Sequence, residues 1–195
     1  GHIFVNGKEV TIRSPKDSYE LGIGMVHQHF KLVDVLTAAE NIILGLPGKG
    51  KLDMKKITED IQKLVDKYGF EMDLSQKIYE MSVSQKQTVE IIKMLYRGAR
   101  ILILDEPTAV LTPQEADRLF DILRNMRADG CSIMIITHKL QEVLALSDRV
   151  AILRKGQYID TVETAQANVQ SLSEMMVGAR VDLNIERPQL QNVKK

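Results

Sequence analysis

The chain has 195 residues, with 26 basic and 26 acidic side chains and therefore no formal net charge at pH 7. This balance gives no strong field that would favour nucleic acid or an anionic membrane surface. The single cysteine, Cys131, excludes an internal disulfide, and the sequence contains neither a transmembrane-length apolar run nor the pattern of a signal peptide. We expect a soluble cytoplasmic protein with no nucleic-acid partner.

The N-terminal region is predicted to begin with a hairpin. Its strands cover 2–5 and 9–12 and are joined by Asn6-Gly7, a sequence typical of tight turns. Ser14-Pro15 then supplies an N-cap and a proline at the first helical position, which predicts a short helix. A short strand follows over 23–27.

The middle of the chain is predicted to be helical. The segment Thr37-Ala38-Ala39-Glu40 has the pattern of a capping box, which marks a helix start. Apolar residues between 57 and 68 recur at helical spacing and are followed by Gly69, a typical C-terminal cap. A further helix is expected over 85–97, ending at Gly98.

The last part of the chain alternates between strands and helices. Alternation of strands and helices, with wholly apolar strands such as 101–104, predicts a parallel sheet covered on both faces. In chain order we expect a strand over 101–104, a helix over 113–128 with a capping box at Thr112, a strand over 133–137, a helix over 140–144, a hairpin of 150–153 and 158–162 across Lys155-Gly156, and a helix over 171–177.

An acidic pair follows the most apolar of these strands. Four aliphatic residues, 101–104, run directly into Asp105-Glu106-Pro107-Thr108. Two solvated carboxylates at a strand end would be an ordinary surface feature. The narrower pattern favours magnesium–nucleotide chemistry, in which one carboxylate serves the metal and the other orients a water.

Two further polar residues follow neighbouring apolar strands. Gln28 comes after the strand at 23–27, and His138 comes after the strand at 133–137. Taken alone, Gln28 would be a loop residue and His138 an ordinary structural histidine. Their positions at strand ends, like that of the acidic pair, favour membership of one site.

Together these motifs resemble the ATP-binding cassette (ABC) transporter ATPases, and 102–108 is similar to their Walker B strand. The resemblance implies an α/β fold: a P-loop NTPase-like (RecA-like) parallel sheet core with an inserted α-helical subdomain. It implies ATP and Mg²⁺ as cofactors, with Asp105 and Gln28 at the metal. It also implies that Glu106 is the base that polarises the attacking water, and that His138 contacts the terminal phosphate.

The segment Met81-Ser82-Val83-Ser84-Gln85 is similar to the family signature Leu-Ser-Gly-Gly-Gln. The resemblance implies that Ser82, Ser84 and Gln85 bind nucleotide, by capping the γ-phosphate held by a partner cassette. A helix N-terminus of this type suits an anion.

Three residues near the signature depart from the family pattern. Ser84 stands at the second glycine, Thr88 where arginine is usual, and Thr112 where the D-loop usually has aspartate. Glycine lets the backbone approach a phosphate closely, and a side chain can crowd it. A plain N-capped helix without a fast hydrolytic site therefore stays open as an alternative.

Two segments, 25–45 and 175–178, resemble importers of sugars and nucleosides, in which two cassettes share one polypeptide and such an ending closes the first. The resemblance implies transmembrane permease subunits and a second nucleotide-binding cassette as partners, at the inner face of the cell membrane. The predicted domains are an incomplete core lobe of 1–33 and 98–178, a helical signature subdomain of 34–97, and a polar C-terminal linker of 179–195.

The phosphate loop of the family, G-x-x-x-x-G-K-[ST], does not occur in these residues. We expect an N-terminally truncated chain that lacks the phosphate-loop strand and begins just after the loop. The intact parent would be an ATPase, whereas the fragment alone would neither bind ATP tightly nor hydrolyse it. The missing strand would leave an open edge beside 133–137, through which the fragment would self-associate.

Two other functions remain as alternatives to an importer ATPase. One is an ABC ATPase without a transport role, serving translation or DNA repair, which the importer-like segments disfavour. The other is a non-enzymatic module that docks on a membrane subunit through its helical lobe, 36–97.

Overall fold

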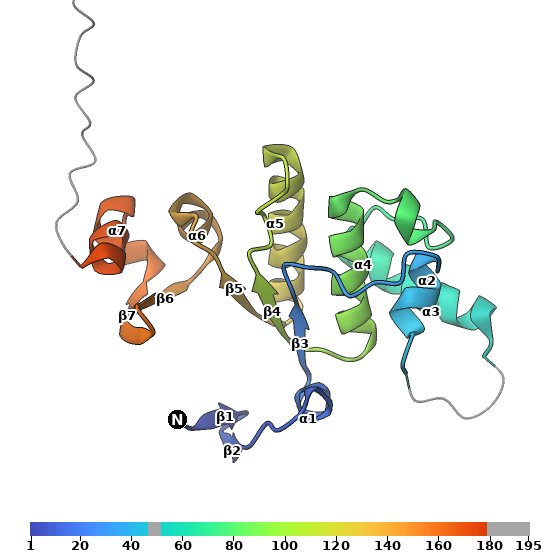
Figure 1. The fold of residues 1–195 in the computed structure, drawn as a ribbon, viewed down its shortest axis with the longest axis horizontal. Coiled ribbons are helices and arrows are strands. Elements are labelled where there is room, and N and C mark those ends of the chain that lie inside the picture. The colour runs from blue at the N-terminus through green and yellow to red at the C-terminus, as the bar shows by residue number, and fades with distance from the viewer. Residues whose placement is uncertain (47–51, 179–195) are drawn as a thin grey trace, which may run out of the picture. The chain divides into compact units, whose positions relative to one another are not determined.

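The computed structural model describes residues 1–46 and 52–178. The chain forms two compact units, Gly1–Thr137 and His138–Lys195. The predicted linker at 179–195 lies outside the described residues. Figure 1 shows the helices and strands of both units.

The first unit is built on a three-stranded parallel sheet in the order β3–β4–β5, whose strands lie side by side in Figure 1. β3 spans Ile23–Val26, β4 spans Ile101–Asp105 and β5 spans Ser132–Ile136. Leu102 and Leu104 of β4 are fully buried, at 1% and 0% exposed. The buried parallel strand predicted from this apolar run is therefore confirmed.

The register of the sheet brings the three strand ends together. Leu104 lies beside Val26 of β3 and beside Ile135 of β5. Since all three strands run in the same direction, the residues that follow them emerge at one edge. This edge carries Gln28, Asp105 and Glu106.

The expectation that the sheet is covered on both faces is wrong for β5. Met134 is 57% and Ile136 is 47% exposed on one face of this strand. α5, which spans Pro113–Ala128, packs against β5, and among the described strands only β4 pairs with it. An apolar strand sequence predicts burial only where another element lies against each face.

Helix α4, which spans Val83–Tyr96, packs on β3 and against two helices, α2 (Ala38–Ile43) and α3 (Met54–Tyr68) (Figure 1). The approach to β3 is close at Gly24, where an added Cβ would lie 2.9 Å from the Cβ of Met94. Only glycine permits this packing distance.

Helix starts follow the predicted capping residues. Ser14 caps α1 (Pro15–Glu20), Thr37 caps α2 and Thr112 caps α5, each with both hydrogen bonds of a capping box. α4 begins at Val83, two residues before the predicted start. The reason is a further capping box between Ser82 and Gln85, which places the serine itself at the N-cap.

The remaining elements of the first unit are short. The N-terminal hairpin pairs β1 (Ile3–Val5) with β2 (Lys8–Val10). Its turn residues Asn6 and Gly7 have φ values of 51° and 75°, as the predicted tight turn requires. The second strand ends at Val10 rather than at the predicted residue 12. A 3₁₀ helix, Ile78–Glu80, precedes α4.

The second unit contains a hairpin and two helices. The hairpin turns at Lys155-Gly156, as predicted. α7 packs on β6, with Leu172 and Ile152 in the small core at 0% and 3% exposed. The elements are α6 (Leu140–Leu146), β6 (Arg149–Arg154), β7 (Gln157–Glu163), a 3₁₀ helix (Thr164–Gln166) and α7 (Val169–Val177).

Asp129 joins the end of α5 to the end of α3. Its Oδ2 lies 2.8 Å from Lys67 Nζ, accepts a hydrogen bond of 2.7 Å from Tyr68 Oη, and lies 3.5 Å from Arg100 Nη1. These contacts, with Lys67 the strongest, lower the pKa of Asp129 to about 2. The carboxylate therefore stabilises the folded state above about pH 4, the ordinary value, and this stabilisation is lost as the pH falls toward 2.

We expect Asp129→Asn to be less stable than the unsubstituted chain at pH 7, with a difference that shrinks as the pH falls from 4 to 2. Urea unfolding across this range measures it. Asp60→Asn is the matched control. Asp60 pairs with Lys63 on the same helix, so this ion pair does not join two helices as Asp129 does. A difference that stayed constant down to pH 2 would contradict the prediction.

Candidate functional site

Gln28, Asp105 and Glu106 lie at the same edge of the parallel sheet. Asp105 is the last residue of β4 and is paired in register with Ile136. Gln28 follows Val26, the last residue of β3, by two positions, and Val26 is paired with Leu104. Gln28 is 77 positions before Asp105 in the sequence. The fold thus brings the glutamine to the same edge as the acidic pair.

Glu106 has an unusual backbone conformation. Its φ is 47°, in the left-handed region that costs a non-glycine residue about 1 kcal/mol or more. The other described non-glycine residues with positive φ, Asn6 and Lys155, lie in hairpin turns. The amide of Glu106 donates a 2.8 Å hydrogen bond to Ile136 O, which holds the turn against β5. Strain held in this way at a strand end supports a functional role for the residue.

Three buried or partly buried polar contacts anchor the loops at this edge. The side-chain amide of Gln87 donates to Pro107 O at 2.7 Å. The Lys31 amide donates to Glu90 Oε1 at 2.8 Å, and Asn41 Oδ1 accepts from the Val33 amide at 2.7 Å. Gln87, Glu90 and Asn41 are not predicted from the sequence. The feature that could have identified these three residues is a polar side chain at an inward-facing position of an amphipathic helix.

His138 is the first residue of the second unit. It lies in the bend before α6, next to Lys139, whose Nζ is 3.3 Å from Glu142 Oε1. Its expected role beside the carboxylates stays a prediction.

The signature segment forms the N-terminus of α4. The Ser82 hydroxyl accepts from the Gln85 amide at 3.3 Å, and the Gln85 side chain accepts from the Ser82 amide at 2.9 Å. Ser82 is thus the N-cap of α4, whose first residue, Val83, lies two residues before the start predicted at 85. The same geometry satisfies the alternative of a plain N-capped helix, so the cap alone does not establish anion binding.

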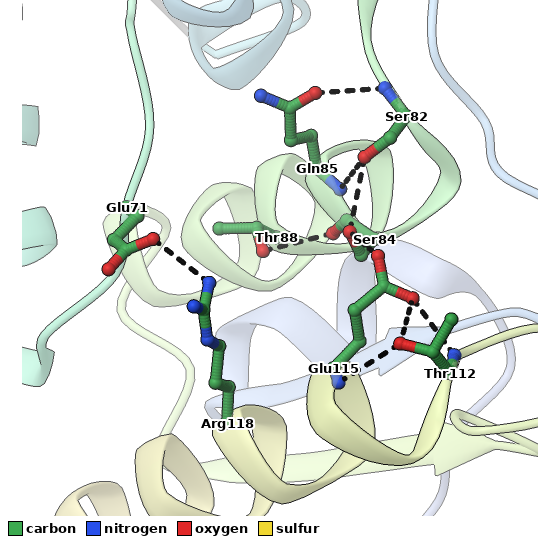
Figure 2. Close-up of polar contacts among 8 residues, drawn as sticks. All are labelled: Glu71, Ser82, Ser84, Gln85, Thr88, Thr112, Glu115 and Arg118. Atoms are coloured by element: carbon green, nitrogen blue, oxygen red, sulfur yellow. Dashed lines mark hydrogen bonds and ion pairs between the residues drawn. The ribbon is translucent and has the colours of Figure 1, made fainter.

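Ser84 contacts the neighbouring helix α5, as Figure 2 shows. Its hydroxyl donates a 2.8 Å hydrogen bond to Glu115 Oε1. Glu115 Oε2 accepts from the Thr112 amide and hydroxyl at 2.9 and 3.0 Å, and the Thr88 hydroxyl donates to Ser84 O at 3.0 Å. The pKa of Glu115 lies below its ordinary value, mainly because of the Thr112 amide and then the Ser84 hydroxyl.

An open hollow of about 380 Å³ lies beside the signature helix. Its walls come from the segment after β3, including Gln28 and Phe30, from Val83 and Lys86 of α4, and from Val110. Val110 is 69% exposed and adds apolar surface to a lining that also includes the polar residues Asp34 and Lys86.

The donor set at the sheet edge suits magnesium. Carboxylate and amide oxygens, here those of Asp105 and Gln28, are ligands that Mg²⁺ accepts, and Mg²⁺ sites usually take one or two protein carboxylates together with waters and phosphate oxygens. Among the described residues no group of three or more His, Cys, Asp or Glu could enclose a metal. A cation held by Asp105 and Gln28 would complete its coordination with waters and phosphate oxygens.

Comparison with known proteins shows the family and the fold. The sequence profile of the ABC transporter family matches residues 1–109. The nucleoside import ATP-binding protein NupA of Lactococcus lactis is 49% identical over 98% of this chain and 38% of its own length. The glucose import ATP-binding protein TsgD13 of Haloferax volcanii is 43% identical over 96% of this chain and 40% of its own length.

A solved nucleotide-free ATP-binding cassette of an ABC transporter has the same fold. Its TM-score is 0.69 and its sequence identity is 25%, over 80% of this chain and 67% of that structure. The P-loop NTPase-like fold expected from the sequence is therefore confirmed. The chain spans about two fifths of the length of the two curated relatives.

Proposed function

The chain belongs to the ABC transporter family, and from this premise we propose that it is part of the ATP-hydrolysing subunit of an importer for a sugar or a nucleoside. The observation that carries the proposal is the shared sheet edge of Gln28, Asp105 and Glu106. The import functions of the two relatives support the solute class.

Each of these residues would have a distinct role in the proposed reaction. Asp105 and Gln28 would hold a magnesium ion. Glu106 would orient and polarise the attacking water, and His138 would contact the terminal phosphate. When bound, magnesium–ATP supplies the phosphoryl group and the cation that offsets its negative charge.

The proposed partners are a permease and a second cassette. The hollow beside α4 would be the docking surface for the permease, and Ser82, Ser84 and Gln85 would face the nucleotide of the second cassette. Within the described residues no helix combines the length and the apolarity needed to cross a membrane. The permease would hold the protein at the inner face of the membrane. Separately, the edge of β5 would be a surface for self-association.

The 195 residues alone are proposed to bind ATP weakly. In sites of this class the amides and lysine of a phosphate loop hold the phosphates, and the chain contains no such motif. Calorimetric titration with magnesium–ATP tests this: we expect no saturable binding in the micromolar range and no hydrolysis. Tight, magnesium-dependent binding by the isolated chain would overturn the claim.

A second experiment distinguishes the ATPase proposal from the alternative of a non-enzymatic docking module. A polypeptide that joins the chain to a phosphate loop of the family pattern is expected to bind and hydrolyse ATP. If it folds and binds a permease subunit without hydrolysing ATP, the ATPase proposal fails and the docking-module alternative is favoured.

A further inference from the structure

Gln87 of helix α4 contacts the turn that carries Glu106. The side chain of Gln87 is buried, and its Nε2 donates a 2.7 Å hydrogen bond to Pro107 O. Pro107 directly follows Glu106 and is buried as well. Because an unpaired buried carbonyl carries a desolvation cost, the bond from Gln87 stabilises this turn in its buried position.

The backbone of Glu106 needs such support. Its φ of 47° lies in the left-handed region, and a proline restricts the conformation of the residue before it. A conformation of this kind persists only where the surrounding structure over-determines it. The Glu106 amide donates to Ile136 O at 2.8 Å, and the Glu106 carbonyl accepts from the Ala109 amide at 3.2 Å. The bond from Gln87 adds a third anchor, one residue further along the chain.

The three anchors differ in how they depend on the sequence. Ile136 and Ala109 contribute backbone groups, which residues of many types would supply equally. The bond from α4 instead needs a side chain that carries a donor and is long enough to reach Pro107 O. Gln87 is therefore the anchor that a single substitution can remove while the two backbone bonds of Glu106 keep their donors and acceptors.

The same helix also holds the segment that carries Gln28. Glu90 is buried, and its Oε1 accepts from the Lys31 amide at 2.8 Å. Lys31 is three positions after Gln28 in the sequence. Because residues three positions apart lie on one face of a helix, Gln87 and Glu90 project from the same face of α4. One helix face thus anchors both segments that follow β3 and β4.

We propose that Gln87 is a positioning residue that, through Pro107 O, fixes where the Glu106 carboxylate lies at the sheet edge. The inference rests on the proposed function, in which Glu106 orients the attacking water. Gln87 itself contacts neither that water nor the nucleotide. Its effect on hydrolysis is exerted through Glu106.

Hydrogen exchange in the 195-residue chain tests the positioning without any need for ATP. Gln87→Met keeps a similar side-chain length and removes the donor. We expect the Glu106 amide to exchange about 3- to 10-fold faster, the range that one net hydrogen bond corresponds to. Amides in the middle of α4, such as that of Ile91, should change less. Equal acceleration at Glu106 and Ile91 would indicate only a loss of overall stability and would overturn the proposal, as would an unchanged rate at Glu106.

A second variant and a control accompany this measurement. Gln87→Glu keeps the shape of the side chain, but an ionised carboxylate only accepts hydrogen bonds, so exchange at Glu106 should again be faster. Gln62→Met is the same substitution on α3, where the Gln62 side chain donates to Asp66 of the same helix at 2.8 Å. It should leave exchange at Glu106 unchanged. Equal acceleration in Gln62→Met would overturn the proposal.

A double-mutant cycle shows whether Gln87 acts through Glu106. In the polypeptide that carries a phosphate loop, we expect Gln87→Met to lower the rate of ATP hydrolysis about 3- to 10-fold, with ATP affinity little changed. In the Glu106→Gln background the same substitution should cause no further loss, because the group that it positions is already gone. Losses that multiplied in the double variant would show that Gln87 acts elsewhere.

A failure of this inference differs from a failure of the proposed function. If exchange at Glu106 responds to Gln87→Met but the unsubstituted polypeptide does not hydrolyse ATP, the contact from Gln87 still positions Glu106 and the ATPase assignment falls. If the polypeptide hydrolyses ATP and exchange at Glu106 does not respond, the ATPase assignment stands and the role of Gln87 falls.

Discussion

Replacing Glu106 by glutamine in the polypeptide that carries a phosphate loop is expected to lower the rate of ATP hydrolysis by about 10²- to 10⁴-fold, the contribution typical of a positioned general base. Glutamine keeps the shape of the side chain but cannot take a proton from water. It also keeps the backbone bond from residue 106 to Ile136 O, so the strained turn stays in place. ATP affinity should change little, because Glu106 is proposed to act on the water and not on the nucleotide.

Steady-state hydrolysis and ATP titration, measured side by side, check this expectation. Glu163→Gln is the matched control, since Glu163 forms an exposed pair with Arg149 on the β6–β7 hairpin, 3.4 Å apart. The control should hydrolyse ATP at the unsubstituted rate. A Glu106→Gln variant that kept more than a tenth of the activity would show that another group serves as the base.

Replacing Asn41 by alanine is expected to lower the free energy of unfolding by about 2–3 kcal/mol, because buried backbone groups would lose their partners. Asn41 is fully buried in α2. Its side chain accepts from the Val33 amide and donates to the carbonyls of Val33 and Thr37, both at 3.0 Å. Alanine would break all three bonds and loosen the segment that leads from Gln28 to α2.

Urea unfolding measures the stability, and hydrogen exchange at the Val33 amide reports the local loosening. Asn125→Ala is the control, because Asn125 is exposed and donates one hydrogen bond of 3.3 Å, to Tyr68 O. We expect the control to lose less than about 1 kcal/mol. Equal losses in the two variants would mean that the three bonds of Asn41 add nothing to the fold.

Helix starts and tight turns were predictable from the sequence because they depend on neighbouring residues. The caps at Ser14, Thr37 and Thr112 and the turn at Asn6 form within a few positions of the residues that specify them. The predicted start of α4 was two residues late because Ser82 and Gln85 were not recognised as a capping box.

Burial and long-range polar contacts were less predictable. The sequence of β5 is as apolar as that of β4, yet Met134 and Ile136 are about half exposed, since coverage depends on what lies against each face. The bond from Ser84 to Glu115 joins residues 31 positions apart on two helices, and no local pattern predicts it.

By itself the sequence determined the family and indicated the residues proposed for its chemistry, because Asp105, Glu106 and Gln28 stand in short motifs directly after strands. Only the tertiary structure decided how such residues are held. Parallel register brings Gln28 to the edge that carries Asp105 and Glu106, and the packing of α4 beside α5 turns three separate departures, Ser84, Thr88 and Thr112, into one network around Glu115. The physical reason is that hydrogen bonds form between groups within about 3 Å of one another, and distance in space is set by packing rather than by position along the chain.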